Sequence, residues 1–444
     1  MRRNMGKYVA MLLCIALVSS VMPASAATDH VKVTKYAANN YSTVESTTTL
    51  TMEQMNSTLP VYGDGVTDYL HQGPIFESEW YDTNCPIYEK YANYTTVQYY
   101  GDHSDMGDYD IWDTSETMNF KTKGAPMGTD VKDLCELVGG MDLGDEIKIR
   151  ASDSLARWFN YTNAYNDHGD ETLDNRQGPM VLAWYAYDNM SGEGGYNGYY
   201  SGIRLVFFAN TTTNVTVKVD GGEEERTLHV FGNWDMHECL APWYRYNYSG
   251  TYPSTNGLSV KYVDNLSIYP PHLHDFNDTG DTVGWAFGTQ FSSIPTNPSD
   301  PSTEFDPTAY ANITADDGIF QSAIASKNNN YAAHRFNFSI NTSTNSDGPI
   351  ANIEKLNVTW NGIGTRPSHD GATLYIWNGT GYEPLDSNED SSEVCLTKEI
   401  TSDISNYVNS GNVTVLVIQN GKTRPGDTST LQTDYVSLEV AHHH

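Results

Sequence analysis

The sequence predicts a β-rich α+β protein in which an α+β domain is followed by a β-sandwich domain. The chain has 444 residues, which is enough for two or three domains. Its aromatic content of 12% is too high for a disordered chain, so packed domains should form. Candidate helices lie in the first half, whereas after about residue 310 strand-like segments alternate with Gly- and Asn-rich turns.

The N-terminal residues 1–26 have the order of a secretory signal peptide. A basic start is followed by an apolar run over residues 8–22 and by the small residues Ala24-Ser25-Ala26. The run is shorter than the ~20 residues of a spanning helix, so we expect cleavage after Ala26 rather than a retained anchor. The mature chain is then expected to be secreted, at the cell surface or in the extracellular envelope, without a membrane span.

The charge balance restricts the partners that the chain can bind. Lys and Arg total 25 against 56 Asp and Glu, for a formal net charge of −31. Nucleic acids and anionic bilayers are bound by clustered Lys and Arg. We therefore expect no nucleic-acid partner.

Sequons of the form Asn-x-Ser/Thr predict a glycoprotein, because glycosylation requires such an asparagine at the surface of a secreted chain. Chance is the alternative, since Asn, Ser and Thr are all common here, but it explains the spread along the whole chain less well. The candidates are Asn40, Asn56, Asn93, Asn160, Asn189, Asn210, Asn214, Asn247, Asn265, Asn277, Asn312, Asn337, Asn341, Asn357, Asn378 and Asn412.

The cysteines of the mature chain, Cys85, Cys135, Cys239 and Cys395, are disulfide candidates whose pairing the sequence leaves open. None has Cys-x-x-Cys spacing, so zinc, iron–sulfur and haem sites are not supported. Cys135 lies on an apolar stripe of helical spacing, which favours a buried thiol. Cys395 lies in the second domain and is the best candidate for an intermolecular bridge.

A short polar lead-in at residues 27–47 precedes the first domain, which we expect over residues 48–270. Thr51 begins a Thr-x-x-Gln capping box, which predicts a helix there. A second helix is predicted over residues 129–138, with Thr129 as its cap and two glycines after its end.

The strands of the first domain are predicted from alternating or short continuous apolar runs. They lie at residues 146–151, 180–185, 203–208, 214–219, 226–231, 258–263 and 266–269. Asp220-Gly221 between the fourth and fifth strands predicts a hairpin, because Asp-Gly fits the positive φ angles of a tight turn.

The second domain is expected over residues 310–441, after a Pro-rich linker at 271–309. Its predicted strands lie at residues 335–340, 356–360, 373–377, 413–418 and 435–440. This succession of short strands and turns predicts a β-sandwich. The last residues, His442–His444, are either a tag remnant or a native tail.

A series of segments in the first domain occurs in a recognisable order: 50–55, 131–140, 149–153, 181–184, 202–206 and 260–263. In order and type they resemble the molybdopterin-binding domain of the sulfite oxidase family. That family holds molybdenum through a Cys in a Cys-x-Gly-Asn-type loop, which is missing here, and the setting of Cys85 in Asn84-Cys85-Pro86 does not match it. Because thiolate ligation needs that sulfur, the resemblance implies a degenerate fold kept without its cofactor.

The second domain also carries matching segments: Asp316–Gly318, Ala333–Phe336, Leu356–Trp360, Leu374–Thr380 and Thr433–Val436. They resemble a β-sandwich module that recurs in surface proteins of methanogenic archaea. With its signal peptide and its acidic, sequon-rich composition, the whole chain resembles the S-layer and sheath proteins of those organisms. The resemblance implies self-assembly into an extracellular envelope.

Two acidic stretches offer the hard oxygen ligands that Ca²⁺ prefers. Asp102, Asp105, Asp108 and Asp110 form the first, and residues 166–171 contain the second. Neither has the spacing of an EF-hand loop, so a solvated acidic loop is the alternative. Apart from Ca²⁺, no cofactor is expected.

Catalytic motifs are weak, and we predict that the protein is not an enzyme. Residues 234–239 place His237, Glu238 and Cys239 side by side, but no flanking motif supports a nucleophilic pair, and we expect a structural loop. A glycosidase needs two paired carboxylates, and any chain with 56 acidic residues offers such pairs by chance.

The sequence thus predicts a non-catalytic structural glycoprotein of the archaeal cell envelope, a sheath or S-layer subunit. Its expected partner is another copy of itself, bound through strand edges and Tyr/Trp surfaces, with glycans or other envelope proteins as further candidates. The alternatives are an extracellular oxidoreductase on the molybdopterin-type fold and a carbohydrate-binding surface protein.

Overall fold

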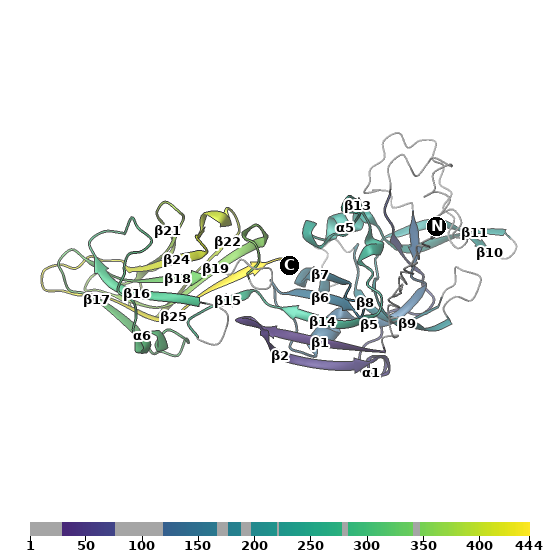
Figure 1. Cartoon of the computed structure of the whole chain (residues 1–444), viewed down its shortest axis with the longest axis horizontal. Coiled ribbons are helices and arrows are strands. Elements are labelled where there is room, and N and C mark those ends of the chain that lie inside the picture. Colours follow the sequence, from purple (N-terminus) through teal and green to yellow (C-terminus); the bar gives the residue numbers. More distant parts are fainter. Residues whose placement is uncertain are drawn as a thin grey trace, which may run out of the picture.

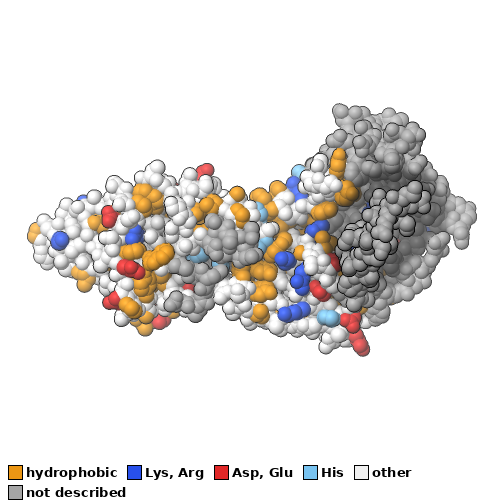
Figure 2. Space-filling view, in the orientation of Figure 1, with side chains coloured by type: hydrophobic (Ala, Val, Ile, Leu, Met, Phe, Trp, Pro, Cys, Tyr) orange, Lys and Arg blue, Asp and Glu red, His pale blue; other side chains and the backbone are white. Residues whose placement is uncertain are grey.

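The computed structural model describes residues 29–75, 119–166, 176–187, 197–219, 222–277, 283–340 and 347–444. These residues form two β-rich units, each with its own hydrophobic core, so the β-rich class is confirmed. The first unit ends with β14 (Val263–Tyr269), and the second begins with β15 (His272–His274). Figure 1 shows the units end to end, and Figure 2 shows one elongated body that narrows between them.

The first unit is built on a five-stranded sheet in the order β2-β1-β14-β6-β7. Its other strands are β1 (His30–Ala37), β2 (Asn40–Thr51), β6 (Glu146–Ala151) and β7 (Ala156–Asn160). A three-stranded sheet contains β5 (Ala125–Asp130), β8 (Met180–Tyr187) and β9 (Asn197–Phe207). A four-stranded sheet contains β10 (Thr212–Val219), β11 (Gly222–Phe231), β3 (Tyr69–Gln72) and β4 (Phe120–Thr122).

Short elements connect these sheets. They are α1 (Met52–Thr58), α3 (Val131–Glu136), α4 (Tyr161–Ala164), α5 (Asn233–Cys239), the 3₁₀ turns η3 (Pro242–Tyr244) and η4 (Thr255–Leu258), and the pair β12 (Asn247–Tyr248) and β13 (Tyr252–Pro253). No helix in the described part of the chain is both long and apolar enough to cross a membrane.

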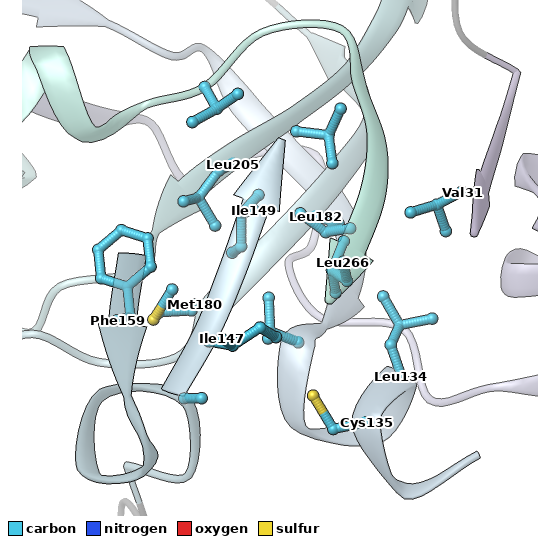
Figure 3. Packing of buried hydrophobic residues seen from close by; sticks show 14 of the residues in the cluster. Val31, Leu134, Cys135, Ile147, Ile149, Phe159, Met180, Leu182, Leu205 and Leu266 are labelled. Carbon is cyan, nitrogen blue, oxygen red and sulfur yellow. The ribbon is translucent and has the colours of Figure 1, made fainter. Parts of the chain in front are cut away.

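The core of the first unit lies between the five-stranded and the three-stranded sheets (Figure 3). Side chains alternate along a strand, so β6 turns both Ile147 and Ile149 inward, where they join Leu182 and Leu205 of the other sheet in one cluster. Cys135 of α3 is fully buried in the same core, which confirms the buried thiol that its apolar stripe predicts.

The predicted lead-in at residues 27–47 is wrong, because its described residues from 30 onward belong to β1, β2 and the turn between them in the main sheet. β1 pairs in parallel with β14, with Val33 opposite Leu266, and β2 pairs with β1. The valines at alternate positions, Val31 and Val33, are fully buried. Burial of this stripe holds the segment against the core of the first unit.

The predicted helix starts and the hairpin are partly confirmed. The capping box of Thr51 is present, and the hairpin of β10 and β11 places Val219 opposite Gly222. The cap of α3 is Asp130 rather than Thr129, because the helix begins at Val131 and the Asp130 side chain accepts from the amide of Lys132. The strand predicted at 258–263 is wrong: this segment is irregular after η4, and β14 starts at its last residue.

The second unit is a β-sandwich of two sheets, in agreement with the predicted architecture. One sheet has the strand order β15-β25-β19-β22, and β17 also pairs with β25. Besides β15, its strands are β17 (Gln321–Ala325), β19 (Ile353–Thr365), β22 (Val394–Ile400) and β25 (Ser429–His442). The other sheet has the strand order β16-β18-β24-β20-β21, and β23 also pairs with β24. Its strands are β16 (Val283–Phe291), β18 (Tyr331–Ser339), β20 (Ala372–Trp377), β21 (Tyr382–Ser387), β23 (Val408–Asn409) and β24 (Asn412–Gln419). The short helices are α6 (Pro307–Ala311), η5 (Ile350–Asn352) and η6 (Ile404–Asn406).

The core of the sandwich is filled by alternate residues of its strands. Along β19 the inward residues include Leu356, Val358 and Trp360, and Trp360 is fully buried. Residues 271–309 were predicted as a linker, but the described residues among them belong to the sandwich, because β15 pairs with β25 and β16 pairs with β18. Of the prolines that suggested a linker, Pro295, Pro298 and Pro301 lie in the loop between β16 and α6, and Pro307 is the first residue of α6.

Candidate metal centre

The junction between the two units contains a buried cluster of His272, His274 and Asp347. β15 places both histidines on one face, because residues two apart on a strand point the same way. Asp347 precedes Gly348, whose φ of +72° turns the chain toward η5. The relative side-chain exposures of the three residues are 1%, 2% and 0%.

One carboxylate oxygen of Asp347 accepts hydrogen bonds from both imidazoles. Asp347 Oδ1 lies 2.8 Å from Nδ1 of His272 and 2.6 Å from Nε2 of His274. Since a carboxylate only accepts, each of these nitrogens donates its proton. Burial alone would raise the pKa of Asp347, but the two hydrogen bonds from His272 and His274 outweigh it and hold the pKa well below its ordinary range. The carboxylate is therefore charged inside the protein.

His442, at the end of β25, is a third histidine beside this cluster. Its side chain packs against Gly348, next to Asp347, and the residue is only 7% exposed. Neither ring nitrogen has a hydrogen-bond partner among the described residues. Burial lowers the pKa of His442 to about 3, so the ring is neutral and both nitrogens are uncharged near pH 7. A buried polar group without a partner is costly, and a metal ion would supply one.

The ligand types and the spacing fit a transition metal. The ligand atoms of His272, His274 and Asp347 all lie within 4.8 Å of one another. Neutral imidazole and carboxylate are ligands of Zn²⁺, at about 2.0–2.2 Å. In a tetrahedron of that size neighbouring ligands are about 3.3 Å apart, so the N···O distances of 2.6 and 2.8 Å would have to increase by about 0.7 and 0.5 Å.

Contacts around the cluster come from both units. The rings of Tyr41 and His272 lie 4.9 Å apart, and the Tyr41 hydroxyl donates to the carbonyl of Pro270. The amide of Leu273 donates to the carbonyl of Ala38 at 2.9 Å. β2 and the turn that precedes it in the first unit therefore contact the start of the second unit.

The C-terminal histidines are packed against the first unit rather than forming a loose tail. His443 stacks on Trp243 at 4.2 Å between ring centroids, and His444 stacks on Trp158 at 4.1 Å. Glu146 accepts from Nδ1 of His444 at 2.6 Å through one oxygen, and from the hydroxyl of Tyr244 at 2.5 Å through the other. Burial and then the charge of Glu146 raise the pKa of Tyr244 well above its ordinary range, which keeps the hydroxyl protonated as a donor.

The residues that the sequence offered for chemistry do not gather here. Asp102, Asp105, Asp108 and Asp110 lie outside the described residues, as do positions 167–171 of the second acidic stretch. Residues 234–239 form α5 instead of the expected loop, and His237 pairs with Glu238 at 2.9 Å. Residues two apart on a helix do not face each other, so this helix does not build the His–Cys pair.

The cysteine and sequon predictions have mixed outcomes. Cys135, Cys239 and Cys395 form no disulfide with one another, and Cys85 lies outside the described residues. None of the described sequon asparagines is classed as buried. Glycosylation itself stays a prediction.

Sequence reasoning missed the junction cluster. Its members come from residues 272–274 and 347, so only the fold brings them together. The sequence His272-Leu-His274 has a spacing that places two histidines on one face of a strand. The prolines nearby led to the prediction of a linker, so this segment was not predicted as a strand.

Comparison with known proteins gives a match to a family model over the second unit and a match to an archaeal protein. Residues 281–442 match a family model described as "Uncharacterized protein, C-terminal domain". An uncharacterized protein of Archaeoglobus fulgidus is 34% identical over 118 residues, which cover 25% of this chain and 18% of that protein. The chain thus spans less than a fifth of the curated relative that it matches.

Comparison with solved structures returns a carbohydrate-binding module from the β-sandwich superfamily, from a study of promiscuous specificity. It is 12% identical and the match covers 65% of this chain and 96% of that one, with a TM-score of 0.17. At that score the likeness supports no argument about fold or ligand.

Proposed function

We propose that this chain is a non-catalytic structural subunit of an extracellular envelope, which associates with copies of itself. We further propose that a transition-metal ion in the junction cluster fixes the orientation of its two units. The observation that carries the proposal is the buried junction, which joins two β-rich units directly where a Pro-rich linker was expected. A subunit that repeats in a lattice or filament needs such a fixed shape.

The burial of the junction cluster supports a structural role over catalysis. His272, His274 and Asp347 have almost no exposed side-chain surface, so a substrate has no path to an ion held there. Catalytic zinc sites keep an open position for water or substrate, whereas structural sites are closed by protein ligands. A site formed by these buried side chains, with His442 beside it, would be of the closed kind.

The edge strand β2 offers a surface for self-association. No described strand pairs with its outer side, and its only charged residue is Glu45. Native proteins protect sheet edges with charges and prolines. β21 follows that rule with Glu383, Pro384 and Asp386, and β22 carries charges as well, whereas β2 consists largely of Ser and Thr. An edge of this composition can receive a strand from another copy.

Self-association is tested by placing charge on this edge. Sedimentation velocity of the mature protein over a concentration series should show dimers and larger species for the wild type. Thr43→Lys/Val44→Lys should remain monomeric, because lysine on a strand edge opposes pairing. Thr401→Lys/Ser402→Lys places the same charge at exposed loop positions and should assemble like the wild type. A wild type that stays monomeric throughout, or an edge variant that assembles normally, contradicts the proposal.

The metal at the junction is tested by its stoichiometry. Wild-type protein is stripped of metal with a chelator, incubated with Zn²⁺ and dialysed. It should retain one equivalent of zinc, and the His274→Ala protein should lose that equivalent. His30→Ala is the matched control, because His30 is exposed on β1. Equal zinc content in the wild type and His274→Ala would overturn this part of the proposal. Elemental analysis of the same samples also tests the oxidoreductase alternative, which requires bound molybdenum.

A further inference from the structure

A second cluster, far from the junction in sequence, brings three carboxylates together on the sandwich. Asp316 lies in the loop before β17, Glu393 directly precedes β22, and Asp434 lies on β25. One carboxylate oxygen from each lies within 4.8 Å of the other two. No ion pair between these acids and a Lys, Arg or His occurs within the described chain.

Asp434 makes this more than a group of surface acids. The residue is fully buried, at 0% exposure. Its Oδ2 accepts from the amide of Gly318 at 2.9 Å, but Oδ1 has no hydrogen-bond partner among the described residues. A buried carboxylate oxygen without a donor carries a large desolvation cost, and the acids beside it add repulsion. A cation would remove both penalties.

Asn361 adds another oxygen at the same place. Its Nδ2 donates to Asp316 Oδ2 at 2.8 Å, while its own Oδ1 is buried and has no partner among the described residues.

We propose that Asp316, Glu393 and Asp434 bind a Ca²⁺ ion, with Oδ1 of Asn361 as a further ligand. All are hard oxygen donors, which Ca²⁺ takes at 2.3–2.6 Å. Two ligands on opposite sides of Ca²⁺ are then about 4.6–5.2 Å apart, so three oxygens within 4.8 Å of one another fit around one ion. Backbone carbonyls and water would complete the six to eight ligands that the ion requires.

The ion would tie two loops to the sheet. Asp316 brings the segment that enters β17, Glu393 brings the connection from β21 to β22, and Asp434 anchors both to β25. Binding only to the folded state raises stability with the logarithm of ligand concentration. The second unit should therefore unfold at a higher temperature when Ca²⁺ is present.

The test uses the full chain, stripped with EDTA and titrated with CaCl₂ by isothermal calorimetry and thermal unfolding. Glu393→Gln should lose one Ca²⁺ equivalent relative to the wild type, or weaken that site at least tenfold, and should lose most of the Ca²⁺-dependent rise in Tm. Asp390→Asn is the matched control: it is exposed in the same loop and should bind like the wild type.

Asp434→Asn should lose Ca²⁺ binding to the same extent as Glu393→Gln. If the Asp434→Asn protein fails to fold, the Glu393→Gln variant still tests the site, because Glu393 is exposed. A wild type without Ca²⁺ binding at millimolar concentration overturns the proposal. So does a Glu393→Gln protein with wild-type stoichiometry and affinity. Neither outcome depends on β2 or on the junction, so failure here is distinct from failure of the proposed function.

Discussion

His334, in the core of the sandwich, should make the stability of the protein depend on pH. It lies on β18, is fully buried, and its Nδ1 is 2.8 Å from Oγ1 of Thr433. That hydroxyl also accepts the indole N–H of Trp360 at 2.8 Å. Burial lowers the pKa of His334 to about 3, so the ring is neutral near pH 7. Protonation would place a charge in the core.

The size and sign of the effect follow from proton linkage. The pKa of a histidine in an unfolded chain is about 6.5, so between that value and about 3 the unfolded state binds the extra proton. Stability therefore falls as the pH decreases through this window, by about 1.4 kcal/mol per pH unit. Between pH 7 and pH 5 the contribution of His334 is a loss of about 2 kcal/mol.

Equilibrium urea unfolding of the wild type and His334→Gln at pH 7 and pH 5 measures this loss. Other groups titrate alike in the two proteins, so the difference between their free energies of unfolding isolates His334. We expect the wild type to lose about 2 kcal/mol more than the variant between the two pH values. If the free energies of unfolding of the wild type and the variant differ by the same amount at pH 7 and pH 5, the assignment of a neutral, buried imidazole is refuted.

Other substitutions test the cores and the thiols. Trp360→Ala removes a fully buried side chain and should cost about 3–5 kcal/mol of unfolding free energy, measured by denaturation against the wild type. Gly178→Ala should lower the Tm by several degrees, because φ is +61° and a Cβ there would lie 1.9 Å from the carbonyl oxygen of Phe208. Cys395, which is exposed, should react with a thiol reagent in the folded protein, whereas Cys135 should react only after unfolding, because burial raises its pKa and blocks access.

Local patterns in the sequence were sufficient for several elements of the fold. The capping box at Thr51 and the Asp-Gly hairpin between β10 and β11 depend on a few neighbouring residues, and both are present. The strands at 146–151 and 373–377 were also found, because alternation or a short apolar run marks them directly.

Elements set by distant contacts could not be found in this way. β15 has three residues and follows two prolines, so only its pairing with β25 reveals it as a strand. β1 is held by parallel pairing with β14, more than two hundred residues later. The candidate metal centre has the same origin: His272 and Asp347 are 75 residues apart and meet only after the sandwich has folded.

Hydrogen–deuterium exchange on assembled and unassembled protein tests most directly whether this chain builds an envelope through its own copies. The outer amides of residues 42–49 in β2 are the ones that pairing with another copy would bond. We predict strong protection of this segment on assembly, with little change at the charged edge β21. Assembly that leaves residues 42–49 exchanging as in the monomer would contradict the account.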